Sequence, residues 1–275
     1  MCFKILKKLP LLKIKTAVAI GVFDGVHIGH SRVISHIVSS EFYPVVLTFN
    51  FNNCVPSSKK NFIYIVSNKK KFELLKKLGV KLIVSIYFED VKNLSFNSFF
   101  EYVLVRRLNA KLIVCGENLR FGLNRQGSLK DLKFLAMKRN IDVIAVKTVK
   151  LQGFVVSSSR VRLAIENADF DLVFKMLGRI YEMEFYFKFI KYYMGFSIFK
   201  KKLNEKFATP SEGKYLAYAK ILNRIYLVTL KIFECCSGKM LCFRILQNLN
   251  LSSCYVKLMF IKKIYWKFWN ILICN

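Results

Sequence analysis

The sequence lacks three features that would each have pointed to a particular class of protein. It has no run of about 18 uncharged apolar residues, so we predict no transmembrane helix. Its eight cysteines form no CxxC pair and have no histidine at zinc-ligand spacing, which favours reduced, partly buried thiols in a cytosolic protein over a metal site. The first residues, Met1 to Leu12, carry no small-residue cleavage site, so we expect them to belong to the first domain rather than to a signal peptide.

Apolar and positively charged residues are abundant instead. Hydrophobic residues make up 54% of the 275 positions, which excludes a wholly disordered chain. The formal net charge of +29 would suit a nucleic-acid-binding protein. However, the excess is mostly lysine, is spread over the whole length, and accompanies many Phe, Tyr, Ile and Asn residues, all of which have AT-rich codons. We therefore expect a solvated basic surface with no specific nucleic-acid partner and no membrane partner.

The first two thirds of the chain alternate between apolar strands and amphipathic helices. The run from Thr16 to Val22 is continuously apolar, which is typical of a buried parallel strand, and a helix should follow from Ile28 to Ser39. Further strands are expected at Tyr43 to Phe49, Lys81 to Ile86, Lys111 to Gly116 and Asp142 to Val146. Further helices are expected at Asn68 to Leu78, Phe96 to Leu108, Leu129 to Arg139, Ser159 to Glu166 and Phe170 to Leu177. This rhythm predicts an α/β fold with a doubly wound parallel sheet.

The pattern changes after Tyr181. Segments Lys214 to Ile221, Ile225 to Phe233 and Met240 to Leu246 have the character of strands separated by turns, and helix signals are weak. We place a domain boundary near Met183, which gives a first domain of residues 1–183 and a small β-rich domain of residues 184–275.

The most informative segment joins the first strand to the first helix and reads Gly21-Val22-Phe23-Asp24-Gly25-Val26-His27-Ile28-Gly29-His30. Ligands of open parallel sheets bind at the carboxyl ends of strands, and the free N–H groups of a helix N-terminus favour an anion there. The glycines let a ligand approach the backbone, and two histidines three positions apart can both face it. The chain has three histidines in all, so two in one such junction indicate a phosphate site rather than a chance turn.

The string GxFDGVHxGH resembles the ATP-binding motif of the bacterial bifunctional riboflavin kinase/FAD synthetase family. Other segments resemble that family in the same order, across about residues 15 to 181. They are Val46 to Phe49, Ser67 to Leu75 with Lys69 to Lys71, Cys115 to Gly122 with Arg125 and Gly127, Val156 to Arg162, and Leu177 to Tyr181.

The resemblance implies an HxGH nucleotidyltransferase that transfers AMP from ATP to FMN, with Mg²⁺ bridging the phosphates and no dedicated metal ligands. His27 and His30 would contact the ATP phosphates and the charge that develops on them. Ser158, Ser159 and Arg162 would hold the β- and γ-phosphates. Gly21, Phe23, Asp24, Gly25 and Gly29 would shape the nucleotide pocket. Asn118 and Arg120 would lie on the flavin side, beside a mobile glycine, Gly122.

The sequence also departs from that family. Asn50 to Asn53 replace the loop that carries its His and two Pro residues, and the family's acidic residue after the fourth strand corresponds to Glu117 or Asn118. The second half resembles the family's riboflavin kinase, which is a small β-barrel, and Leu251 to Asn275 would be its last strand plus a helix. Its phosphate motif is lost at Ser197 to Lys200, and Met240 to Leu246 holds no acid that could act as the general base. We therefore expect weak or absent kinase activity.

Three alternatives remain. The first is a class I aminoacyl-tRNA synthetase-like protein, because His27 to His30 also match the histidine motif of that class. However, no second signature loop of that class stands at a strand–helix junction. The second is a non-catalytic flavin- or nucleotide-binding remnant. The third is a nucleotidyltransferase for another small molecule, such as a nicotinamide or pantetheine phosphate.

Overall fold

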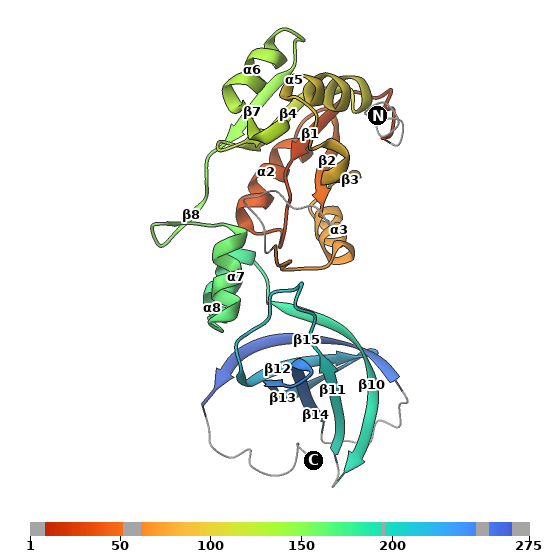
Figure 1. Ribbon diagram of the computed structural model, residues 1–275, viewed down its shortest axis with the longest axis vertical. Coiled ribbons are helices and arrows are strands. Elements are labelled where there is room, and N and C mark those ends of the chain that lie inside the picture. Colours follow the sequence, from red (N-terminus) through yellow and green to blue (C-terminus); the bar gives the residue numbers. More distant parts are fainter. Residues whose placement is uncertain (1–8, 52–61, 194–195, 246–252, 266–275) are drawn as a thin grey trace. The chain divides into compact units, whose positions relative to one another are not determined.

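A computed structural model describes residues 9–51, 62–193, 196–245 and 253–265 (Figure 1). The chain divides into two compact units. Residues 1–62 and 67–157 form the first unit, and residues 63–66 and 158–275 form the second. None of the helices in the described ranges has the length and apolar character that a bilayer crossing requires.

The first unit is built on a five-stranded parallel sheet with the order β3-β2-β1-β4-β7. Its strands are β1 (Thr16–Ile20), β2 (Tyr43–Asn50), β3 (Leu82–Tyr87), β4 (Ala110–Gly116) and β7 (Asp142–Val146). Its longer helices are α2 (Ile28–Val38), α3 (Asn68–Lys77), the π-helix η2 (Phe99–Arg107) and α6 (Leu129–Met137). Shorter elements are α4 (Phe88–Val91), α5 (Phe96–Ser98), η3 (Leu123–Arg125) and the hairpins β5 (Arg120–Phe121) with β6 (Gly127–Ser128) and β8 (Lys150–Leu151) with β9 (Phe154–Val155).

Both faces of this sheet are covered. All five residues of β1 are buried, as expected of a central strand. Ala17 and Ala19 lie in one apolar cluster with residues of α2 and α3, whereas Val18 and Ile20 lie in the other with residues of η2 and α6. The doubly wound α/β class that the sequence predicted is therefore confirmed.

The strand order creates a switch point beside β1. The chain winds outward from β1 through β2 to β3, and then returns to the other side of β1 with β4 and β7. In such sheets the crevice at the carboxyl ends of the strands flanking the switch point is the usual ligand site. Here those strands are β1 and β4.

The second unit holds a closed antiparallel barrel with the order β10-β11-β14-β13-β12-β15 (Figure 1). The strands are β10 (Glu182–Tyr193), β11 (Phe196–Lys202), β12 (Gly213–Ile221), β13 (Arg224–Cys235), β14 (Gly238–Ile245) and β15 (Ser253–Ile264). Alternating burial along β12 directs every second side chain inward, and the rings of Phe187, Phe199 and Phe243 are fully buried against one another. The expected small β-barrel domain is thus present.

Two helices belong to the same unit as the barrel. They are α7 (Ser158–Glu166) and α8 (Phe170–Leu177). Phe170 stacks on the rings of Tyr181 and Phe260 and meets Tyr215 edge-on. These contacts group α7 and α8 with the barrel, whereas the sequence motifs placed the boundary after them, near Met183.

Several sequence predictions differ from the structure. The helix expected at Phe96 to Leu108 is a short α-helix that continues as a π-helix. β10 and β11 were not predicted as strands. The last strand expected within Leu251 to Asn275 is present as β15, and the helix expected after it falls on residues 266–275, which lie outside the described part.

Candidate active site

The loop between β1 and α2 carries the histidine motif at the carboxyl end of β1. Phe23, Gly25 and Val26 all have positive φ angles, of 53°, 78° and 42°. Such angles are costly for a side chain as large as Phe or as branched as Val, and they persist only where the surroundings impose them. Phe23 and Val26 are buried, so packing holds the loop in this shape. Backbone held in unfavourable conformations is concentrated at functional sites.

The two glycines that flank this loop make room for aromatic rings. A Cβ on Gly21 would lie 3.0 Å from the Phe23 ring, and a Cβ on Gly29 would lie 3.1 Å from the His27 ring. The glycine at position 29 therefore lets the imidazole of His27 lie against the first turn of α2.

His27 and His30 cap the helix for each other. His27 is the N-cap residue of α2, and its Nδ1 accepts a hydrogen bond from the His30 backbone N–H at 3.3 Å. The Nδ1 of His30 in turn accepts from the His27 backbone N–H at 3.3 Å. The two rings are stacked, with centroids 3.6 Å apart and an interplanar angle of 16°. Because each Nδ1 accepts, the ring proton of each neutral imidazole belongs on Nε2, so Nε2–H is the ring donor of each histidine.

Two further buried polar residues, Thr48 and Lys71, contact the start of this loop. Thr48, at the carboxyl end of β2, donates from Oγ1 to the Val22 carbonyl at 2.9 Å. The Nζ of Lys71, from α3, lies 3.2 Å from Thr48 Oγ1 and 3.5 Å from the same carbonyl. The sequence analysis placed this lysine in a helix that resembles the family but gave it no role in the site. Its burial, at 3% exposure, is what singles it out.

The loop after β4 begins at the carboxyl end of the second strand that flanks the switch point. The carboxylate of Glu117 accepts from the Thr148 backbone N–H at 2.8 Å and from the Thr148 hydroxyl. These bonds, with the hydroxyl contributing most, hold the pKa of Glu117 below its ordinary value. Glu117 therefore ties the β4–β5 loop to the segment after β7. Asn118 and Arg120, the expected flavin-side residues, are exposed in the β4–β5 loop and on β5.

The glycine expected to be mobile beside Arg120 is packed instead. Gly122 has φ 75°, and a Cβ there would lie 2.6 Å from the backbone nitrogen of Phe96. Gly127 is also tight, since its Cβ would lie 2.5 Å from that of Phe96. The glycines of this segment therefore allow the β5–β6 hairpin to lie against Phe96.

The residues expected to hold the β- and γ-phosphates lie on α7, in the second unit. Ser158 and Ser159 form the start of this helix. Arg162 follows one turn later, and its Nε donates to the carbonyl of Ile63 at 2.5 Å. Ile63 begins a short segment of the same unit, in which Tyr64 pairs with Phe207. The Nε–H donor of Arg162 is thus used in a contact within the second unit.

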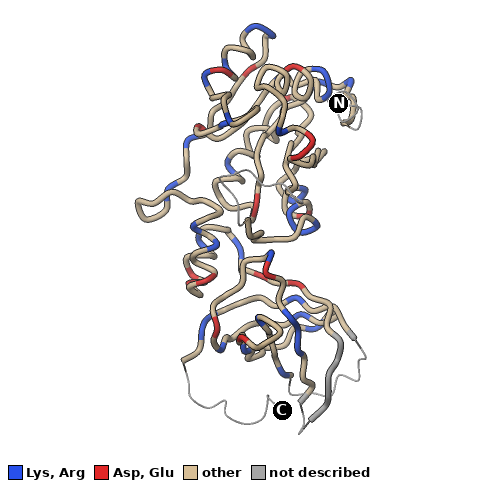
Figure 2. The backbone as a smooth tube through the Cα atoms, viewed as in Figure 1, with Lys and Arg blue, Asp and Glu red and all other residues tan. Residues whose placement is uncertain are grey.

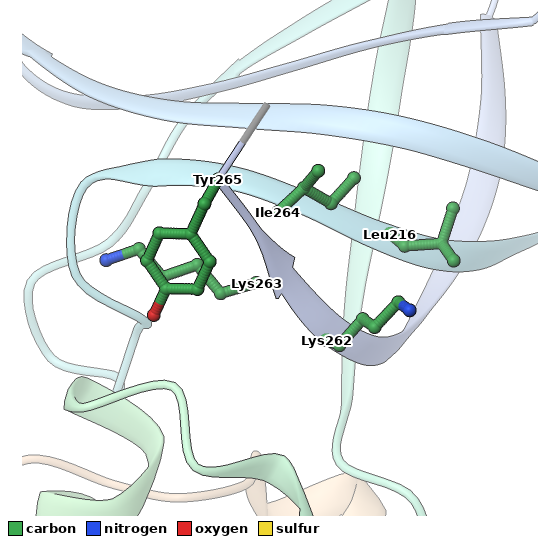
Figure 3. A pocket seen from close by; sticks show the side chains of 5 residues that line it. All are labelled: Leu216, Lys262, Lys263, Ile264 and Tyr265. Carbon is green, nitrogen blue, oxygen red and sulfur yellow. The ribbon is translucent and has the colours of Figure 1, made fainter. Parts of the chain in front are cut away.

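The barrel has a hollow of its own, with a volume of about 440 Å³. Leu216, Lys262, Lys263, Ile264 and Tyr265 line it, from β12 and the end of β15 (Figure 3). Lys and Arg residues occur along elements of both units (Figure 2). No sequence motif had pointed to this hollow.

Comparison with known proteins connects these features to one family. The FAD synthetase family pattern matches residues 10–160. The bifunctional riboflavin kinase/FMN adenylyltransferase of Buchnera aphidicola subsp. Acyrthosiphon pisum is 28% identical over 180 residues, 61% of this chain and 56% of that protein. The protein with the same description from Pseudomonas fluorescens is 26% identical over 224 residues, 78% of this chain and 67% of that protein. The chain therefore spans little more than half the length of the first relative.

A solved structure supports the fold. The crystal structure described as a macrolide-efflux protein from Streptococcus pneumoniae superimposes with a TM-score of 0.80, covering 94% of this chain and 88% of that one at 22% identity. At this identity the likeness speaks for the architecture of both units and not for an activity. Because the family pattern covers more than half of the sequence and includes the histidine loop at the carboxyl end of β1, this chain belongs to the FAD synthetase family.

Proposed function

We propose that the protein is an FMN adenylyltransferase that forms FAD and pyrophosphate from FMN and Mg²⁺-ATP. An oxygen of the FMN phosphate attacks the α-phosphorus of ATP in line and forms the new P–O bond. The bond from that phosphorus to the oxygen bridging to the β-phosphorus breaks, and pyrophosphate leaves. This reaction needs positioning and neutralisation of charge more than a protein nucleophile.

The observation that carries the proposal is the pair of stacked imidazoles at the N-terminus of α2. Their Nδ1 atoms are used in the mutual cap, which orients both rings and leaves Nε2–H as the donor of each. The helix N-terminus adds the positive end of its dipole and its own N–H groups. A triphosphate bound there would meet directional donors that are already in place, so little reorganisation is needed as charge develops.

In this proposal Ser158, Ser159 and Arg162 of the second unit bind the β- and γ-phosphates. The hydroxyls and N–H groups at the start of α7 and the guanidinium of Arg162 are suited to the β- and γ-phosphates. Mg²⁺ would be held by the phosphates of ATP and by water rather than by a dedicated set of side chains, and it would supply positive charge to offset the charge on the phosphates. Gly21, Phe23, Asp24, Gly25 and Gly29 shape the loop around the nucleotide.

The flavin would lie at the switch point, where Asn118 and Arg120 follow β4. A second pair of groups supports a ligand at this edge of the sheet. Asn50 Oδ1 and Ser85 Oγ, near the carboxyl ends of β2 and β3, are buried and have no hydrogen-bond partner among the described residues. Buried polar atoms of this kind are normally satisfied by water or a ligand.

The barrel is proposed to lack riboflavin kinase activity. Position 242 of β14 lies in the strand from which the family's general base would project, and it is a fully buried cysteine. The rings of Phe199 and Phe243, with centroids 4.8 Å apart, are stacked and fully buried in the same barrel. A buried thiol is a poor acceptor for a hydroxyl proton.

One incubation tests both halves of the proposal. Purified protein is supplied with Mg²⁺-ATP and either FMN or riboflavin, and the products are separated by chromatography. FAD from FMN and no product from riboflavin is expected. FAD or FMN from riboflavin would show a working kinase barrel, whereas no FAD from FMN would leave a nucleotide-binding protein without this activity. Amino-acid-dependent exchange of pyrophosphate into ATP would instead point to the synthetase-like alternative.

A further inference from the structure

Lys71 is a buried cation in a helix whose other lysines are exposed, at positions 69, 76 and 77, or partly buried, at position 70. It is 3% exposed, whereas Lys69, two positions earlier, is exposed. Burying an ammonium group is costly unless oxygens surround it, and an apolar side chain of similar length would fill the space without that cost. A lysine at this position therefore calls for a role that depends on its charge.

Two contacts of Lys71 connect it to the start of the histidine loop, one directly and one through Thr48. Its Nζ lies 3.5 Å from the Val22 carbonyl, which also accepts from Thr48 Oγ1 at 2.9 Å. Nζ and Thr48 Oγ1 are themselves 3.2 Å apart. Val22 directly precedes Phe23, the first of the three residues with positive φ that lead to His27. The lysine and the threonine together hold the carbonyl from which this unusual turn starts.

We propose that Lys71 is a positioning residue for the nucleotide loop. Through Val22 and Thr48 it fixes the turn that presents His27 and His30, and its buried positive charge favours a triphosphate at the N-terminus of α2. This inference rests on the proposed function. It adds a cation that acts on the loop through Val22 and Thr48.

Replacement of Lys71 by methionine keeps the length of the side chain and removes its charge. Lys69→Met, on the same helix, is the matched control. In hydrogen exchange without ligand, K71M should exchange faster than wild type over residues 21–27, where Gly21 N–H bonds to Leu47 O at 3.1 Å and Val26 N–H bonds to Phe23 O at 3.3 Å. Titration with ATP should show an affinity about ten to a hundred times lower, the range for loss of a charge-assisted hydrogen bond. K69M should match wild type in both.

Thr48→Val provides a second variant in case K71M folds poorly. Because Thr48 and Lys71 share the Val22 carbonyl, T48V should also loosen residues 21–27, and the double variant should lose less ATP affinity than the two single losses added together. Lys71→Arg, which keeps the charge, should recover part of the affinity. Additive losses in the double variant, or a K71M protein with wild-type exchange and wild-type ATP affinity, would overturn the inference.

The two proposals can fail separately. A wild-type protein that binds ATP but makes no FAD contradicts the proposed reaction, and the exchange and titration data still decide the role of Lys71. If FAD is formed and K71M raises the KM for ATP in proportion to its loss of affinity, both proposals stand. If FAD is formed and K71M is unchanged in every measurement, the reaction stands and the role of Lys71 falls.

Discussion

The imidazoles of His27 and His30 lie stacked with centroids 3.6 Å apart, each accepting the other's backbone N–H. A capping box normally pairs a small polar N-cap with a Glu or Gln three positions later. Here two histidines form the same reciprocal hydrogen bonds and so stabilise the start of α2. The spacing that indicated a phosphate site thus also has a role in folding.

His30→Ala should lower the turnover number for FAD formation on the order of a hundredfold, because it removes a positioned donor from the developing charge. His36 lies on the same helix outside the loop, so His36→Ala is the matched control and should keep wild-type turnover. Steady-state rates with saturating FMN and ATP give the comparison. An H30A enzyme with normal turnover would exclude His30 from the chemistry.

Substitutions at His27 should separate its two roles. Asparagine is a good N-cap, so His27→Asn should retain most of the stability of α2 while losing the Nε2 donor. His27→Ala should lose both, with a further cost to folding of about 1 kcal/mol. Thermal melts combined with rates test this. Equal melting temperatures for the two variants would show that the cap seen at His27 contributes nothing to stability.

The sequence predicted the first unit well and the second less well, for physical reasons. Strands such as β1 and β7 are short apolar runs next to clear turn or cap signals, and local pattern is enough to place them. β10 and β11 are rich in aromatic residues and lysines, and they become strands because they pair with distant segments, β10 with β15 and β11 with β14. Pairing of this kind is decided by tertiary contacts.

Within the site, residue types were predictable and their contacts were not. The histidines were found from their spacing, but their mutual cap depends on backbone angles that the sequence does not specify. Lys71 was named only as part of the family-like helix Ser67 to Leu75 and was given no role, because a lysine among lysines normally faces water. Its burial follows from the packing of α3 against the sheet, which only the fold reveals.

The bond between Glu117 and Thr148 should appear in the pH dependence of stability. Because the folded state holds the pKa of Glu117 below its ordinary value, its contribution is present above that ordinary value and is lost as pH falls through the folded pKa. Thr148→Val removes the hydroxyl donor, so it should lower the melting temperature at neutral pH and converge with wild type in acid. Thr148→Ser keeps the hydroxyl and serves as the control. A deficit in T148V that is the same at every pH would mean that only packing was lost.

The cysteines should differ sharply in reactivity. Burial raises the pKa of Cys115 to about 11, and it also raises the pKa of Cys254, so neither forms much thiolate at neutral pH. Cys236 is exposed, and the hydrogen bond from Ser237 lowers the pKa of its neighbour Cys235, the last residue of β13.

Iodoacetamide at pH 7.5 should therefore alkylate Cys235 and Cys236 in the folded protein and reach Cys115 and Cys254 only after denaturation, as read by peptide mass spectrometry. Ser237→Ala should slow the reaction at Cys235, since it removes the group that favours the thiolate, and should leave Cys236 unchanged. Labelling of Cys115 in the folded protein as fast as that of Cys236 would contradict the burial of β4 between two helical layers, on which the position of the nucleotide loop depends.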